Sequence, residues 1–98
     1  MQIETIIKSL ADPTRLRIMR LLAAMELAVG ELAQVLEQSQ PRVSRHVGIL
    51  CDAGLAERRR EGSWVFLHTP SISEDNALLD AIIHLLATAE REDAGFAR

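Results

Sequence analysis

With 98 residues, of which 48% are apolar and 26% charged, the chain has the length and composition of one small globular domain with a thin core. No apolar run approaches the roughly 18 residues that cross a membrane. The N-terminal stretch MQIETIIKSL mixes an acid and a base into an amphipathic pattern rather than a secretory signal. A single cysteine, Cys51, excludes an internal disulfide framework. We therefore expect residues 1–98 to form one domain, located in the cytoplasm.

The formal net charge of −3 by itself argues against a nucleic-acid partner, but the charge is unevenly distributed along the chain. Residues 1–37 hold four basic and five acidic side chains, residues 38–69 five and three, and residues 70–98 two and six, so the balances are −1, +2 and −4. Exposed charges are screened beyond about 8 Å at physiological salt, so the local balance decides which partner a surface attracts. The middle third is therefore the part suited to an anionic partner.

Apolar residues at helical spacing predict three helices in the first third of the chain. The first helix carries Ile3, Ile6, Ile7 and Leu10. Asp12 and Pro13 suit the N-cap and first turn of a second helix. The apolar side of that helix carries Ile18, Leu21, Leu22 and Met25. A short third helix, about residues 29 to 37, is expected to bury Leu32, Val35 and Leu36.

A fourth helix is predicted between Ser39, a favourable N-cap, and Gly54, a favourable left-handed stop. Its core-facing stripe consists of Val43, Val47 and Leu50. The runs LAERRR and SWVFLHT that follow are typical of short strands. Glu61-Gly62-Ser63 between them predicts a hairpin turn.

A last helix is expected to start near Ser73, where Glu74 and Asp75 suit a positive helix N-terminus. Its apolar face is wider than a small domain needs for itself and comprises Leu78, Leu79, Ile82, Ile83, Leu85 and Leu86. The breadth of this face favours a dimer. The expected fold class is α+β, mainly helical.

The start of the fourth helix is polar on the side away from its apolar stripe, where it carries Gln40, Arg42, Ser44 and Arg45. Guanidinium groups suit guanine, a carboxamide suits adenine, and free backbone N–H groups attract phosphate. The third helix and a tight turn precede it, which is the pattern of a helix-turn-helix. The hairpin with Arg58, Arg59 and Arg60 would then be a wing along the DNA backbone. Because strand residues alternate, at most two of these arginines can face DNA together.

Four segments resemble the ArsR/SmtB family of bacterial winged-helix repressors, in order and in register. They are ADPTRLRI (residues 11–18), SQPRVSRH (39–46), AGL (53–55) and RREGSWVF (59–66). The likeness extends over about residues 3 to 90. It implies a winged helix-turn-helix, a homodimer joined by the first and last helices, a recognition helix from Ser39, a wing turn at Gly62, and repression of a promoter.

The positions that the family uses for DNA contact fall on Gln40, Pro41, Ser44 and Arg45, with Pro41 in place of a commoner small polar residue. The DNA-binding residues expected in all are Gln40, Pro41, Arg42, Ser44, Arg45, His46, Arg59, Arg60 and Ser63. For His46 a phosphate contact and a structural role are equally open. The residues expected at the dimer interface are Ile3, Ile6, Ile7, Leu78, Ile82 and Leu85.

Metal-released members of the family pair thiolates at a segment that aligns here with Ala28-Val29-Gly30, whose side chains cannot bind a metal. Asp80 and His84 share a helical face but make an incomplete set of ligands. We therefore expect no metal and no other cofactor, and release by a small organic effector, a fused domain or a partner. Cys51 is expected to be an inert buried thiol, and Trp64 and Phe66 to belong to the core at the base of the wing.

No glycine-flanked nucleophile or paired-acid spacing supports an enzyme. The sequence predicts a sequence-specific DNA-binding transcriptional repressor that reads an inverted repeat of double-stranded DNA as a homodimer. Two alternatives stay open. Some ArsR-like units continue into a methyltransferase domain, so the chain could be the DNA-reading part of a longer protein. The acidic last third could instead suit a winged-helix module that binds protein.

Overall fold

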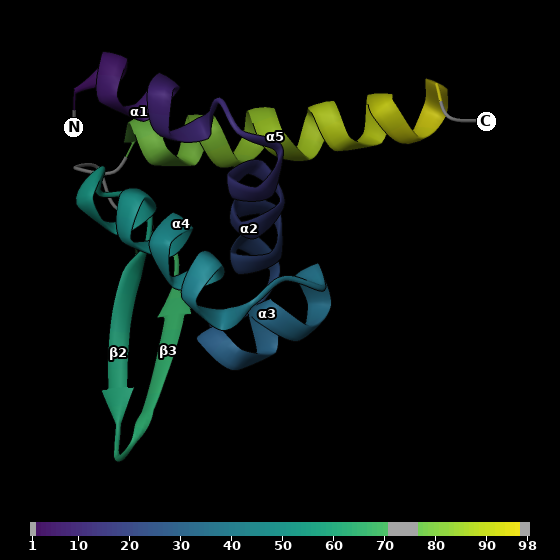
Figure 1. Cartoon of the computed structure of the whole chain (residues 1–98). Coiled ribbons are helices and arrows are strands. Elements are labelled where there is room, and N and C mark those ends of the chain that lie inside the picture. The colour runs from purple at the N-terminus through teal and green to yellow at the C-terminus, as the bar shows by residue number, and fades with distance from the viewer. Residues whose placement is uncertain (1, 71–76, 97–98) are drawn as a thin grey trace.

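The computed structural model describes residues 2–70 and 77–96, which form five helices and three short strands (Figure 1). The helices are α1 (Ile3–Leu10), α2 (Pro13–Ala24), α3 (Val29–Leu36), α4 (Gln40–Asp52) and α5 (Ala77–Phe96). The strands are β1 (Leu27–Ala28), β2 (Glu57–Glu61) and β3 (Trp64–His68). This order confirms the predicted winged helix-turn-helix, α+β and mainly helical. The predicted start of the last helix near Ser73 lies outside the described residues.

The helices begin and end at the residues whose chemistry predicted their limits. The Asp12 carboxylate accepts a hydrogen bond from the Arg15 backbone N–H at 3.0 Å, and this bond lowers the pKa of Asp12. The Ser39 hydroxyl accepts from the Arg42 N–H at 3.4 Å and caps α4. Gly54 has a φ of 79°, the left-handed conformation expected of a helix stop. Glu37 takes the same conformation, with a φ of 56°, to end α3.

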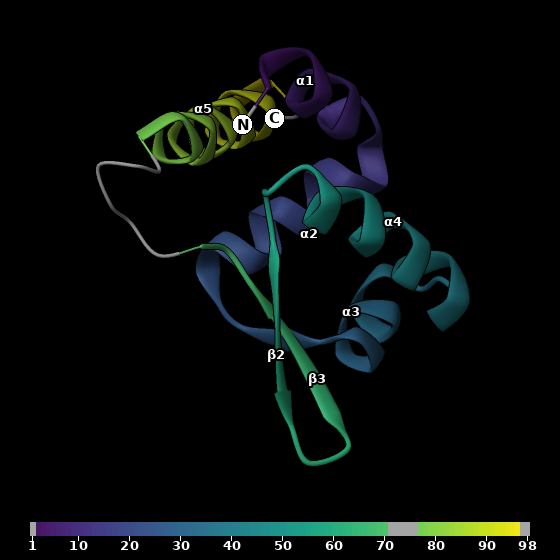
Figure 2. The same ribbon diagram turned by 90° about the vertical axis from the view of Figure 1, so that its left-hand side faces the viewer.

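The strands form one antiparallel sheet in the order β1-β3-β2. β2 and β3 make the predicted hairpin, in which Arg59 pairs with Phe66 and Glu61 with Trp64, and Gly62 supplies the positive φ of 60° in its turn. β1 was not predicted. It pairs Leu27 with Leu67 and Ala28 with Phe66, and so connects the body of the protein to the hairpin. The hairpin, residues 57–68, projects from the helices and is called the wing below (Figure 2).

The core is aliphatic and is built from every helix and from the base of the wing. Its fully buried side chains include Ile6, Ile18, Met19, Leu32, Val43, Leu50, Leu55, Leu67 and Leu79. Two predicted core residues are exposed. Met25 follows the end of α2 in extended backbone, which turns it off the helix face, and Val35 lies on the flank of α3 between the buried Leu32 and Leu36.

α1 and α5 lie at the end of the molecule opposite the wing tip (Figures 1 and 2). Of the expected dimer residues, Ile6 and Ile82 are buried in the core of the single chain. Their neighbours Ile3, Ile7, Leu78 and Leu85 are exposed, Leu85 to 64%. In the described part of the chain, no helix has the length and apolar character needed to cross a membrane.

Candidate nucleic-acid interface

The polar flank at the start of α4 faces solvent while the opposite flank packs into the core. Gln40, Ser44 and Arg45 are exposed, whereas Val43 and Val47 are buried. The turn before α4 is held to α2, because the Gln38 side-chain amide donates a hydrogen bond to the Thr14 hydroxyl at 3.1 Å. The second helix of the helix-turn-helix is thus fixed with its polar flank outward, as groove insertion requires.

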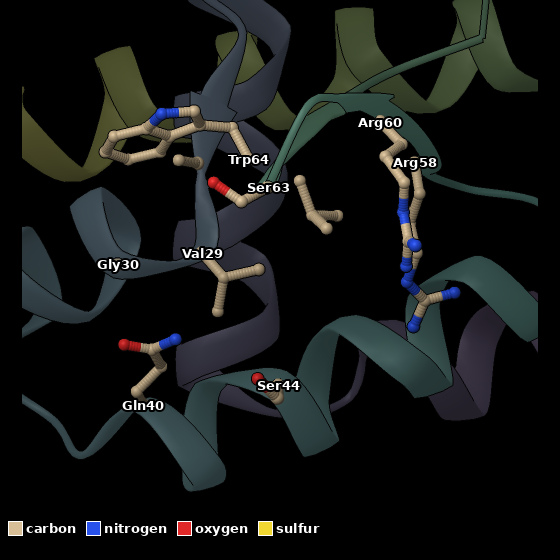
Figure 3. A pocket seen from close by; sticks show the side chains of 10 residues that line it. Val29, Gly30, Gln40, Ser44, Arg58, Arg60, Ser63 and Trp64 are labelled. Carbon is tan, nitrogen blue, oxygen red and sulfur yellow. The ribbon is translucent and has the colours of Figure 1, made fainter.

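A groove of about 860 Å³ separates α4 from the wing (Figure 3). Its lining comes from three places: Ala28, Val29 and Gly30 at the start of α3, Gln40 and Ser44 on α4, and Arg58, Arg60, Ser63, Trp64 and Val65 on the wing. Figure 3 shows Arg58 and Arg60 side by side, with their guanidinium groups directed toward α4. The structure therefore brings four of the residues expected to bind DNA, Gln40, Ser44, Arg60 and Ser63, together around one groove with Arg58.

The three consecutive arginines of β2 divide between the two faces of the wing. Arg58 and Arg60 line the groove, and among the described residues neither makes an ion pair or a side-chain hydrogen bond. Arg59 projects from the opposite face, where it binds Glu26 and Glu61 at 2.6 and 2.8 Å. This placement does not support the expected contact of Arg59 with DNA. Strand alternation separated Arg59 from its neighbours, but the sequence did not show which face meets the groove.

Gly48 of α4 lies opposite Arg58, at a distance where an alanine side chain would also fit. A Cβ atom at Gly48 would lie 3.8 Å from the Arg58 guanidinium nitrogen Nη2. Gly48 sits in the middle of α4, where glycine costs about 1 kcal/mol relative to alanine. The sequence signal that pointed to Arg58 was strand alternation, which places it on the same face of β2 as Arg60.

The other predicted side chains of α4 lie beside the groove rather than in it. Pro41, Arg42 and Arg45 are exposed and do not line the groove. No side-chain hydrogen bond or ion pair of Arg42 or Arg45 occurs within the described ranges 2–70 and 77–96. Their guanidinium groups are available to an external partner.

His46 is half-buried and its Nδ1 lies 3.3 Å from Nη1 of Arg15 on α2. The same arginine donates through Nε to the carbonyl of Ser9, near the end of α1. Arg15 thus joins α1 to α4 through the His46 ring. Of the two roles left open for His46, this contact supports the structural one.

Neither Trp64 nor Phe66 belongs to the core at the base of the wing, where both were expected: Phe66 lies under Arg59, and Trp64 is one of the residues that line the groove. Trp64 is 61% exposed and stacks on Phe66 with ring centroids 6.3 Å apart. The Arg59 guanidinium lies 4.8 Å from the Phe66 ring centroid, a cation–π contact. The wing base is closed instead by the buried aliphatic residues Leu55 and Leu67.

The single thiol and the side chains that could bind a metal are the remaining candidates for chemistry. Burial raises the pKa of the Cys51 thiol, which keeps it protonated and weakly nucleophilic at neutral pH. Among residues 2–70 and 77–96, no three His, Cys, Asp or Glu side chains are grouped as a metal ion would require. Asp80 is half-buried and His84 exposed on α5.

A helix-turn-helix with an exposed polar second helix, flanked by a wing with unpaired arginines, defines a winged helix-turn-helix protein of the DNA-binding class. The family model described as "Bacterial regulatory protein, arsR family" matches residues 12–58. The chain is also 34% identical over 91 residues to the biofilm growth-associated repressor of Agrobacterium fabrum, covering 91% of this chain and 75% of that protein. The chain belongs to the arsR family of bacterial regulatory proteins.

Other relatives agree with this assignment. The chain is 49% identical over 59 residues to the arsenical resistance operon repressor of Escherichia coli. The match covers 59% of this chain and 50% of that protein. Reduced HlyU from Vibrio cholerae superimposes with a TM-score of 0.75 at 35% identity, covering 87% of this chain and 84% of that chain. A homodimeric winged helix-turn-helix DNA-binding domain from Mycobacterium bovis gives 0.72 at 32% identity, covering 88% and 78%.

Proposed function

We propose that the protein is a transcriptional regulator that binds double-stranded DNA sequence-specifically, with α4 in the major groove and the wing on the backbone. The observation that carries this proposal is that Arg58 and Arg60, which have no ion-pair partner among the described residues, face the polar start of α4 across one groove. Two neighbouring cations without a carboxylate partner repel each other. A phosphate between them removes that repulsion, and DNA supplies phosphates beside the bases that α4 would read.

The side chains divide into two roles. Arg45 and Gln40 project from the exposed start of α4 and suit guanine and adenine edges, respectively. Arg58, Arg60 and Ser63 come from the wing and suit phosphate oxygens, which carry no sequence information. Base contacts therefore supply specificity, and wing contacts supply affinity and register.

Dimerisation is proposed through the exposed apolar residues of α1 and α5. Ile3, Ile7, Leu78 and Leu85 leave an apolar surface on the single chain at the end opposite the wing tip. A two-fold partner would cover this surface and place two copies of α4 on one face of the DNA, so the site read is an inverted repeat. The homodimeric state of the Mycobacterium bovis relative supports this arrangement.

We further propose that the regulator represses transcription in the bacterial cytoplasm by occupying a promoter. Two of the relatives above, from Escherichia coli and Agrobacterium fabrum, are repressors by name. The signal that ends repression is proposed to be a small organic effector, a fused domain or a partner, because Ala28, Val29 and Gly30 cannot bind a metal where metal-released members of the family pair thiolates.

The test is selection of bound duplexes from a random pool, followed by affinity measurements on the selected duplex and on a scrambled duplex of the same composition. Arg45→Ala should weaken binding to the selected duplex by about 1–3 kcal/mol and leave the scrambled duplex almost unaffected. Arg91→Ala, which removes an exposed arginine of α5, is the matched control and should change neither. Equal loss on both duplexes would contradict a base-reading role for Arg45.

A further inference from the structure

The Arg59 guanidinium is held on three sides on the wing face opposite the groove. Its Nε and Nη2 donate to the two carboxylate oxygens of Glu26 at 3.1 and 2.6 Å, a forked contact. Its Nη1 donates to Glu61 at 2.8 Å, and its flat face covers the Phe66 ring. The hydrogen bond from Arg59 also lowers the pKa of Glu26. Such forked pairs fix orientation as well as distance.

Glu26 belongs to the body of the protein, not to the wing. It lies between the end of α2 at Ala24 and β1, which starts at Leu27. The Glu26–Arg59 contact therefore connects two segments that are 33 residues apart in the chain. This contact lies beside the short β1–β3 ladder, in which Ala28 of β1 pairs with Phe66 of β3.

The wing needs such a connection because little else fixes its direction. All five residues of β2 are exposed, and a two-stranded hairpin is only marginally stable by itself. Its base is attached to the body through the buried Leu55 and Leu67, through the two residue pairs between β1 and β3, and through contacts of β3 with α2 and α3. A forked contact on one face sets the angle at which the other face presents Arg58 and Arg60 to the groove.

We propose that Glu26 and Arg59 form a clamp that fixes the wing, so that Glu26 is a positioning residue for DNA binding although it lies outside the groove. The proposal rests on the proposed function. It assigns the arginine triplet two jobs: the outer arginines meet the DNA, and Arg59 holds them in place. The positive charge of Arg59 is balanced by the carboxylates of Glu26 and Glu61, so Arg59 adds little to the attraction of phosphate.

The single tryptophan of the chain gives a direct readout of the clamp without DNA. Trp64 lies on the wing and stacks on Phe66, the ring beneath Arg59. Time-resolved fluorescence anisotropy of the free protein should show a larger amplitude of nanosecond local motion in Glu26→Gln than in the wild type. Glu90→Gln, which removes the same charge from an exposed position on α5, should leave Trp64 motion unchanged.

The second readout is the ratio of affinities for the selected and scrambled duplexes at one salt concentration. Glu26→Gln makes the protein less negative, so charge alone predicts tighter binding to both duplexes. The clamp predicts instead that the ratio falls about three- to five-fold, as loss of an ion pair allows, while scrambled binding does not weaken. Arg59→Lys keeps the charge but cannot make the forked contact, and it should lower the ratio similarly.

Unchanged Trp64 motion in Glu26→Gln, or an affinity ratio equal to that of Glu90→Gln, would overturn the clamp. Both substituted residues are partly exposed, and helical circular dichroism identifies any variant that does not fold. Failure of the proposed function has a different signature. The wild type would then bind selected and scrambled duplexes equally, and Trp64 motion would still decide whether the clamp exists.

Discussion

Arg58 and Arg60 should each control how steeply DNA binding depends on salt. Both line the groove beside α4 without an anionic partner in the described part of the chain. If each meets one phosphate, Arg60→Ala removes one contact per subunit and two per dimer. With a slope of about 0.9 per neutralised phosphate, the plot of log affinity against log salt should flatten by about 1.8. The double variant Arg58→Ala with Arg60→Ala should flatten it by about 3.6.

The assay is fluorescence anisotropy of a labelled scrambled duplex titrated with protein at four salt concentrations between about 50 and 200 mM. A scrambled duplex isolates the electrostatic contribution from base reading. Arg91→Ala is the control, because it removes the same charge from α5, at the end of the molecule away from the wing tip. A wild-type slope in Arg60→Ala, or an equal flattening in Arg91→Ala, would refute the phosphate contact.

Three further outcomes are expected. Leu85→Glu should give a folded monomer by sedimentation at micromolar concentration, because Leu85 is exposed on the single chain; a persistent dimer would contradict the proposed interface. Asp12→Ala should lower the free energy of unfolding by about 1 kcal/mol at neutral pH. Because the folded-state pKa of Asp12 lies below its usual 3.8, this difference should shrink as the pH falls through that pKa, and urea titrations at several pH values measure it. Micromolar zinc should leave DNA affinity unchanged; a loss that His84→Ala reverses would show α5 to be a metal sensor.

Local chemistry made the helix limits of the fold predictable from sequence. A helix begins at Asp12 and Pro13 and another at Ser39, and the second of these ends at Gly54. Each limit depends on contacts within a few residues, and each occurs in the structure. β1 has no such signal. Two residues are too few for a period, and Leu27 and Ala28 become a strand only because β3 lies alongside them.

The residues of the candidate site could largely be predicted from the sequence, but the face of the wing on which each arginine lies could not. Helical spacing put Gln40 and Ser44 on one flank of α4, where the structure has them. Strand alternation separated Arg59 from Arg58 and Arg60, but only the structure shows that Arg59 lies on the face that meets Glu26, a residue distant in sequence. Long-range pairing of this kind leaves no trace in local periodicity.

The expected dimer face shows the same limit at finer resolution. Ile6 and Ile7 both fit an apolar helical face, yet Ile6 is buried in the chain and Ile7 is 59% exposed. Likewise Ile82 is buried and Leu85 is exposed on α5. The apolar face of each helix is wider than the surface it packs against in the single chain. Which of its residues are buried in the core and which stay exposed is therefore known only once the packing of α1 and α5 is known.

The central claim is that a dimer reads DNA with two copies of α4, and a hydroxyl-radical footprint on the selected duplex tests it most directly. The account predicts two protected segments on one face of the DNA, with centres about 34 Å or one helical turn apart, and none on the scrambled duplex at the same protein concentration. A single protected segment, or equal protection of both duplexes, would contradict it.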